Sequence, residues 1–345
     1  MRDSRMARYG AAVAAGALVL TMAAPAMAQD GVAEIGYISP EDATDFGWNE
    51  QGLVGAQAAA DSVGGTVIEA AGSGYGDIAP VLNQMVDDGA DFVIAQASGY
   101  NTQAPAWAAE TGIPVVVFDA PDATAPGLVA NVSTDAFQGG YLAGVLAANM
   151  TSTDTLGLVL SANDVNWHKQ AGGFVAGAKS VNPDIAFEQA QIDEFGYGDV
   201  DGGNRVTTAV IAAGADIIFG MGNGSSFGML AAIENNVPEG AEQAWFIDVI
   251  GDKTSIDEQG VLLSSVLWDF SGAFEQAVAD IDAGTFGEQG YVLDAANGGI
   301  GLLQTDHISD EAWAAVEAAS AGIADGSIEV PVATSQEEVD ALIAG

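Results

Sequence analysis

The sequence predicts an α/β protein of two Rossmann-like lobes, each a parallel sheet with helices on both faces, and a hinged cleft between them. Short apolar strands alternate with amphipathic helical segments along the chain, which is typical of such sheets. One pattern occurs twice, since Gly89–Ile94 returns as Gly214–Phe219 and Tyr75-Gly76-Asp77 returns as Tyr197-Gly198-Asp199. A mature chain of roughly 315 residues also exceeds what one hydrophobic core usually supports.

The N-terminus has the pattern of a secretory signal. Arg2, Arg5 and Arg8 precede the apolar stretch Ala11–Ala23, which is too short to span a bilayer. Ala26-Met27-Ala28 then matches a small-x-small cleavage site. We therefore expect residues 1–28 to be removed after Ala28 and the mature protein to be periplasmic.

Composition excludes several classes of function. The absence of cysteine excludes disulfides, thiolate metal sites and a lipid anchor on cysteine, so we expect a protein that is not lipidated. The chain has 7 Lys and Arg against 48 Asp and Glu, a formal net charge of −41. Nucleic acid is excluded as a partner because its recognition requires a basic patch. We expect a monomer that is adapted to a salty medium.

The elements follow one plan in each half: a helix after an Asp, a glycine stop, a short apolar strand and a Gly/Ser-rich turn. The first strand is Val32–Ile38, and helices are expected at Leu53–Val63, from Asp77 to Val86, and at Phe137–Met150. Further strands are expected at Val67–Ile68, Phe92–Ile94, Pro114–Asp119, Leu128–Val132, Thr155–Leu160, Ile185–Gln189, Asp216–Gly220, Ala244–Val249 and Val261–Leu267.

The chain is expected to cross between the lobes three times, near Asn131–Asp135, after Leu267 and near Tyr291. The first lobe would then hold residues 29–132 and about 268–290. The second would hold residues 133–267 and about 291–345.

The turn after the first strand, Thr44–Gly55, is the first place to look for a site, because ligands of open α/β sheets bind beyond the carboxyl ends of strands. Trp48 offers a flat face for stacking, and Asn49 can both donate and accept hydrogen bonds, with Asp45 beside them. Alternatively, Trp48 packs in the core and Asn49 caps the helix.

Other candidates follow later strands. Tyr100, Trp167 and Trp268 are aromatic residues that would line a cleft, unless they pack in the core or hinge. Ser98-Gly99-Tyr100 and Gly222-Asn223-Gly224 occupy equivalent turns of the two halves, where glycine allows backbone N–H groups to approach a ligand.

Several segments resemble the basic-membrane-protein type of ABC transporter substrate-binding proteins, within the type I periplasmic-binding fold. The resemblance spans Val32 to about Leu303, and its motifs are Asp45–Glu50, Gly89-Ala90-Asp91, Phe118-Asp119, Phe174–Gly177 and Leu262–Leu267. It implies a nucleoside receptor that delivers its ligand to an ABC permease in the inner membrane. No bond is made or broken, so an enzyme is not expected.

The resemblance also implies roles for single residues. Trp48 and Asn49 match a pair that contacts the nucleoside, and Asp119 matches a polar ligand contact. Asp248 is the expected match for a ribose-binding Asp, with Asp252 as the alternative. A Lys that often follows the Ser-x-Leu strand in this family is replaced by Trp268-Asp269, which weakens the expectation of ribose. The acids Asp119, Asp248 and Asp269 would also tolerate a cationic ligand and disfavour a phosphorylated one.

Alternative functions keep the same fold or use other residues. A sugar-binding or sensory protein would use the same cleft. Gly224–Gly228 spells a nucleophile elbow around Ser226, with His307 as the base downstream, which is the distant alternative of a serine hydrolase. We expect no cofactor and no metal, because His168 has no ligand partner nearby and the acids from Asp193 to Asp201 lack EF-hand spacing.

Overall fold

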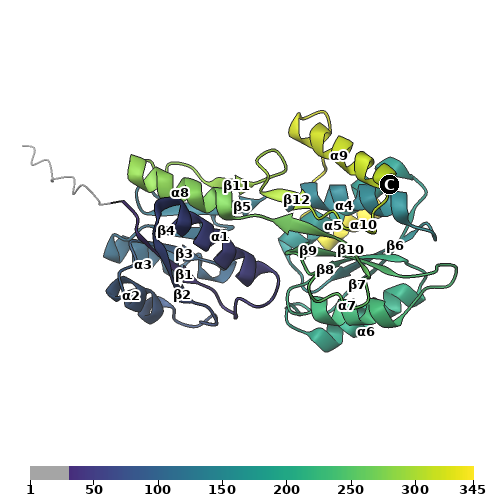
Figure 1. Cartoon of the computed structure of the whole chain (residues 1–345), viewed down its shortest axis with the longest axis horizontal. Coiled ribbons are helices and arrows are strands. Elements are labelled where there is room, and N and C mark those ends of the chain that lie inside the picture. Colours follow the sequence, from purple (N-terminus) through teal and green to yellow (C-terminus); the bar gives the residue numbers. More distant parts are fainter. Residues whose placement is uncertain (1–30) are drawn as a thin grey trace, which may run out of the picture. The chain divides into compact units, whose positions relative to one another are not determined.

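The computed structural model describes residues 31–345. The signal sequence and cleavage site expected in residues 1–28 lie outside the described residues. Within 31–345 the chain builds two six-stranded sheets with helices against them (Figure 1).

The first sheet has the strand order β11-β5-β4-β3-β1-β2, and all its neighbouring strands are parallel. Its strands are β1 (Glu34–Ile38), β2 (Thr66–Ala70), β3 (Phe92–Ala95), β4 (Val115–Phe118), β5 (Val129–Thr134) and β11 (Tyr291–Leu293). The associated helices are α1 (Trp48–Val63), α2 (Ala79–Asp87), α3 (Gln103–Thr111) and α8 (Ser271–Ala283), with short 3-10 turns at Ser98–Tyr100 and Pro121–Ala123.

The second sheet has the order β12-β10-β9-β8-β6-β7, and only β12 runs antiparallel to its neighbour. Its strands are β6 (Thr155–Leu160), β7 (Ala186–Gln191), β8 (Ile217–Met221), β9 (Trp245–Ile250), β10 (Leu262–Trp268) and β12 (Ile300–Leu302). The helices are α4 (Ala136–Met150), α5 (Val165–Val181), α6 (Val200–Ala212), α7 (Ser226–Asn235), α9 (Asp310–Ala324) and α10 (Gln336–Ala344). The order β5-β4-β3-β1-β2 therefore recurs as β10-β9-β8-β6-β7, which confirms the predicted fold of two lobes.

Three crossings join the lobes. The first lies at Asp135, between β5 and α4, and the second follows β10 at Asp269-Phe270. β11 pairs with β5, so Tyr291–Leu293 belongs to the first sheet, although the sequence placed the last crossing near Tyr291. That crossing lies between β11 and β12, at 294–299.

Helices α4 and α5 pack so closely that their backbones are in direct contact (Figure 1). A methyl group built at Gly144 of α4 would overlap the carbonyl oxygen of Phe174 in α5, and one at Gly177 would overlap that of Tyr141. This confirms the close packing that the glycines between Phe137 and Met150 predict. The two helices form one layer that packs against the second sheet.

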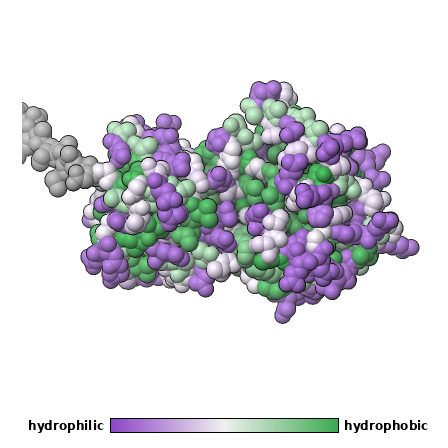
Figure 2. All heavy atoms as spheres, in the orientation of Figure 1, coloured by the Kyte–Doolittle hydropathy of each residue, from purple (hydrophilic) through white to green (hydrophobic). Residues whose placement is uncertain are grey.

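The described surface is rich in hydrophilic side chains, which cover much of the face seen in Figure 2 between smaller apolar areas. Among residues 31–345, no helix combines the length and apolar character needed to cross a membrane.

The glycine contact between α4 and α5 can be tested directly. Gly144→Ala should lower the free energy of unfolding by about 1–3 kcal/mol, because the added methyl must push the helices apart. Gly272→Ala is the matched control, since Gly272 is an exposed helical glycine with no neighbour within 4 Å of the new methyl. The control should be neutral or slightly stabilising in urea unfolding. Equal effects of the two substitutions would contradict the packing.

Candidate functional site

The turn between β1 and α1 is organised by the carboxylate of Asp45. It accepts hydrogen bonds from the backbone N–H groups of Gly47 (3.0 Å), Asn49 (3.1 Å) and Glu50 (3.0 Å). Glu50 in turn accepts from the N–H of Phe46 at 3.0 Å. These bonds satisfy the free N–H groups of the first turn, so α1 begins at Trp48 and not at Leu53.

Asn49 is held so that one polar atom remains free. Its Nδ2 donates to the Asp45 carboxylate at 2.7 Å, and its backbone oxygen accepts from the hydroxyl of Tyr37 at 2.5 Å. Because a carboxylate can only accept, this contact fixes the orientation of the amide. The Oδ1 atom of Asn49 is buried without a hydrogen-bond partner, and the residue is only 1% exposed.

Trp48 has both of the roles that the sequence left open. Its Nε1 donates to the carbonyl of Gln96 at 2.8 Å, and its ring meets Phe118, Trp268 and Phe270 edge to face at centroid distances of 5.0, 6.0 and 5.5 Å. The ring is thus packed on one side, while it also lines a cavity on the other.

That cavity has a volume of about 550 Å³ and takes residues from both lobes. Six predicted ligand contacts line it, namely Trp48, Asn49, Asp119, Trp167, Asn223 and Trp268, and so do Ser98 and Gly99 of the turn that the sequence also singled out. The remaining lining residues are Pro40, Glu41, Tyr75, Ala97, Asp164, Asn166, Phe195, Tyr197, Gly198 and Ile250. The structure therefore brings together aromatic and polar side chains that are far apart in the chain.

The four other predicted residues do not line the cavity. Asp45 holds the turn, as described above. Tyr100 is fully buried and donates its hydroxyl to the carbonyl of Gly74 at 2.6 Å. Gly222 lies against Ser225 and Ser226, and Asp248 is buried away from the cavity.

Tyr75 and Tyr197 also line the cavity, and the sequence carries a signal for them that we did not predict as a site. They are the first residues of the repeated Tyr-Gly-Asp segment, and each lines the cavity from its own lobe. Because equivalent positions of two related lobes can face one cleft, the repeat also marked candidate lining residues.

Carboxylates dominate the charge of the cavity. Asp119 accepts hydrogen bonds from Ser98 at 2.7 Å and from the side chain of Asn166 at 3.4 Å, and burial raises the pKa of its carboxyl. Burial likewise raises the pKa of Glu41, with the charge of Asp45 adding to the effect. Together with Asp164, these acids line a cavity to which no Lys or Arg of the described chain contributes.

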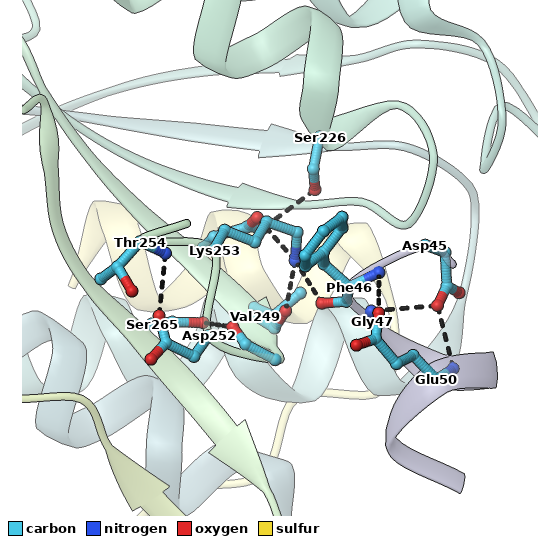
Figure 3. A network of polar contacts seen from close by, with 12 residues as sticks. Asp45, Phe46, Gly47, Glu50, Ser226, Val249, Asp252, Lys253, Thr254 and Ser265 are labelled. Atoms are coloured by element: carbon cyan, nitrogen blue, oxygen red, sulfur yellow. Dashed lines mark hydrogen bonds and ion pairs between the residues drawn. The ribbon is translucent and has the colours of Figure 1, made fainter. Parts of the chain in front are cut away.

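Lys253, one member of a buried ion pair, connects the second lobe to Phe46 of the β1–α1 turn (Figure 3). Lys253 Nζ lies 2.9 Å from Asp248 Oδ2, and both side chains are almost fully buried. Nζ also donates to the carbonyl of Phe46 at 3.0 Å, across the lobes, and to that of Val249 at 3.2 Å. Phe46, whose carbonyl accepts this hydrogen bond, adopts a left-handed backbone conformation with φ of 49°. Burial raises the pKa of Asp248, and Lys253 opposes that rise.

Comparison with protein families matches residues 32–334 to the model described as ABC transporter substrate-binding protein PnrA-like. The chain belongs to this PnrA-like family. A CD4+ T-cell-stimulating antigen of Listeria monocytogenes is 30% identical over 208 residues, which cover 56% of this chain and 57% of that protein. The ABC transporter nucleoside-binding protein BmpA of Lactococcus lactis is 29% identical over 217 residues, or 58% and 60% of the two chains. The alignments thus span little more than half the length of these relatives.

Solved structures share the fold. A solute-binding protein of an ABC transporter system from Aeropyrum pernix superposes with a TM-score of 0.73 at 18% identity, covering 91% of this chain and 96% of that one. A counterpart from Conexibacter woesei gives 0.71 at 20% identity and covers 87% and 99%. The PnrA-like chain therefore has the periplasmic-binding architecture that its sequence predicted.

Neither acid expected to bind ribose in this PnrA-like protein lines the cavity. Asp248 pairs with Lys253, and Asp252 is exposed and accepts from the N–H of Thr254 at 2.8 Å. Trp268, at the position where the resemblance implied a Lys, lines the cavity with its buried Nε1 unpartnered. Of the positions that the resemblance linked to a sugar, only Trp268 thus lines the cavity, and it offers an indole ring and not an ammonium group.

Within residues 31–345, the contacts of Ser226 and His307 do not form the triad that the hydrolase alternative requires. Ser226 is fully buried and donates to Asp248 at 2.9 Å. His307 instead packs on Trp245 with ring centroids 5.0 Å apart. The PnrA-like chain therefore uses the serine of this elbow as a support for the buried ion pair.

The ion pair makes a quantitative prediction. Lys253→Met should lower the free energy of unfolding by about 3–5 kcal/mol, because it leaves Asp248 buried without a counter-charge. The double variant Asp248→Leu/Lys253→Met removes both charges and should recover at least half of the loss in chemical denaturation. A double variant no more stable than the single one would contradict the account.

Proposed function

We propose that this protein is the substrate-binding component of an ABC importer, and that it encloses a small planar solute, with a nucleoside as the favoured class. The observation that carries the proposal is the cavity of about 550 Å³ between the lobes, with aromatic faces and an unpartnered Asn49 Oδ1. A volume of this order suits a small metabolite. Export to the periplasm, a monomeric state and delivery to an inner-membrane permease belong to the same proposal.

The aromatic lining supports a planar ligand. Trp48, Trp167 and Trp268 come from separate segments of the chain and line one cavity. Such rings bind flat, weakly polar surfaces by stacking or edge contacts, and the name of the Lactococcus lactis relative points to nucleosides. Closure would then depend on contacts that the ligand makes with both lobes at once.

The polar lining supports a ligand with several hydrogen-bond donors. Asn49 Oδ1 and Asn223 Oδ1 are buried acceptors without partners, and Trp268 Nε1 is a buried donor without one. Leaving such groups unpaired is costly, so a ligand that pairs with them gains affinity and specificity. Sugars are the second candidate, because aromatic faces beside Asp119 and Asn166 also suit a pyranose ring.

A ligand panel tests the proposal. Thermal shifts against nucleosides, nucleobases and sugars should single out one class, since a ligand at ~100-fold its Kd stabilises the fold by about 2.7 kcal/mol. Trp48→Leu should then weaken that ligand about fivefold or more, the equivalent of a ~1 kcal/mol aromatic contact, in calorimetric titration.

Trp313→Leu provides the matched control. Trp313 lies on α9, packs against the core and does not line the cavity. Its substitution should leave the affinity unchanged. If nucleosides, nucleobases and sugars all fail to raise the melting temperature, the proposed ligand classes are refuted. Equal effects of the two substitutions on affinity would show that Trp48 is not part of the site.

A further inference from the structure

We propose that the ligand carries a positive charge, a protonated or quaternary nitrogen, which binds between Asp119 of the first lobe and Asp164 of the second. The inference rests on the proposed function, because it assigns the charge of the solute that enters the same cavity. It adds a feature that distinguishes a cationic solute from a neutral nucleoside or sugar of the same shape.

The two carboxylates approach one another from opposite lobes. Asp119 follows β4, and Asp164 caps the start of α5. Asn166 contacts both: its N–H donates to Asp164 Oδ1 at 2.7 Å, and its side chain donates to Asp119 Oδ2 at 3.4 Å. A single residue, Asn166, thus bridges the two acids. Their like charges lie close together in the cavity.

Neutral groups hold these carboxylates in place. Ser98 donates to Asp119, and the hydroxyl of Tyr197 donates to Asp164 at 2.6 Å. Hydrogen bonds of this kind stabilise a carboxylate without cancelling its charge. Glu41 adds a third acid to the lining. A counter-charge must come from elsewhere, since repulsion between nearby acids grows as water is excluded.

The protein does not supply that counter-charge within the cavity. Lys169 on α5 is near enough to attract Asp119 and Asp135, but it is not among the lining residues. Within residues 31–345, the one pair of opposite charges closer than 4 Å is Lys253 with Asp248. Asp119 and Asp164 thus remain available to a cation on the ligand.

Aromatic rings surround the same acids. Tyr75, Trp167, Phe195 and Tyr197 line the cavity, and the rings of Trp167 and Tyr197 lie 6.4 Å apart at 54°. Rings that face a cation attract it through their quadrupoles. Asn49, a lining residue of the same cavity whose buried Oδ1 has no partner, is an independent indication of a ligand that donates hydrogen bonds. Carboxylates, rings and a free acceptor together select an ammonium or a cationic heterocycle.

A cation would also favour closure. With the cavity free of cations, bringing the lobes together sets Asp119 against Asp164. A positive group between them turns this repulsion into two attractions that exist only when both lobes are in place, so the ligand stabilises the closed state differentially.

Matched probes that differ mainly in charge test the inference. Cytidine is compared with 3-methylcytidine, and glucose with glucosamine, by calorimetric titration of the mature protein at neutral pH, where the second member of each pair is largely cationic. In the pair that binds, the cationic member should bind at least about tenfold more tightly, a difference of ~1.4 kcal/mol.

Charge-removing variants locate the effect. Asp119→Asn and Asp164→Asn should each reduce the preference for the cationic probe to threefold or less. Asn suits both positions, because Asp119 has a left-handed conformation with φ of 54° and Asp164 is a helix N-cap. Asp122→Asn, an exposed acid of the neighbouring turn, is the control and should keep the full preference.

Each remaining outcome overturns the inference in a distinguishable way. Equal or tighter binding of the neutral members would refute the charge requirement and leave the proposed function standing. A cation preference that survives in both Asn variants would refute the placement between Asp119 and Asp164. Failure of all four probes to bind would overturn the proposed ligand classes, and the inference with them.

Discussion

Four hydrogen bonds to the carboxylate of Asp45 set the position of the site. They begin α1 at Trp48, turn the side chain of Asn49 so that its Oδ1 stays free, and fix the end of the loop that joins β1 to the helix. The same turn is held from the other lobe, because Lys253 donates to the carbonyl of Phe46. The buried Asp248 keeps that lysine in place. A network from two lobes thus positions the first aromatic wall of the cavity.

Much of the fold followed from local pattern. Apolar strands, glycine stops and the repeated Gly-Ala-Asp segment predicted two lobes with parallel sheets. These features were readable because strands and helix ends depend on residues that are neighbours in the sequence. β11 was not recognised as a strand of the first sheet. Tyr291–Leu293 is short and pairs with β5, a partner more than a hundred residues earlier, and no local pattern encodes such pairing.

The site was predictable where its residues follow strands and less so elsewhere. Trp48, Trp167 and Trp268 were found by that rule, and all line the cavity. Asp119, which also lines it, was implied by the family resemblance. Asp248 also lies near the carboxyl end of a strand, yet its buried side chain pairs with Lys253 and does not line the cavity. The rule gives the end of the sheet but not the direction in which a side chain points. Glu41 and Phe195 lie on irregular segments, where the sequence carries no periodicity to read.

We propose that the cavity between the lobes binds a planar, donor-rich solute against Trp48 and Asn49. A crystal structure of the mature protein with its tightest-binding ligand tests this most directly. The account predicts a ring system stacked or edge-packed against the cavity tryptophans, with a ligand donor on Asn49 Oδ1. A ligand bound outside the cavity, or inside it with Asn49 Oδ1 still unpartnered, would contradict it.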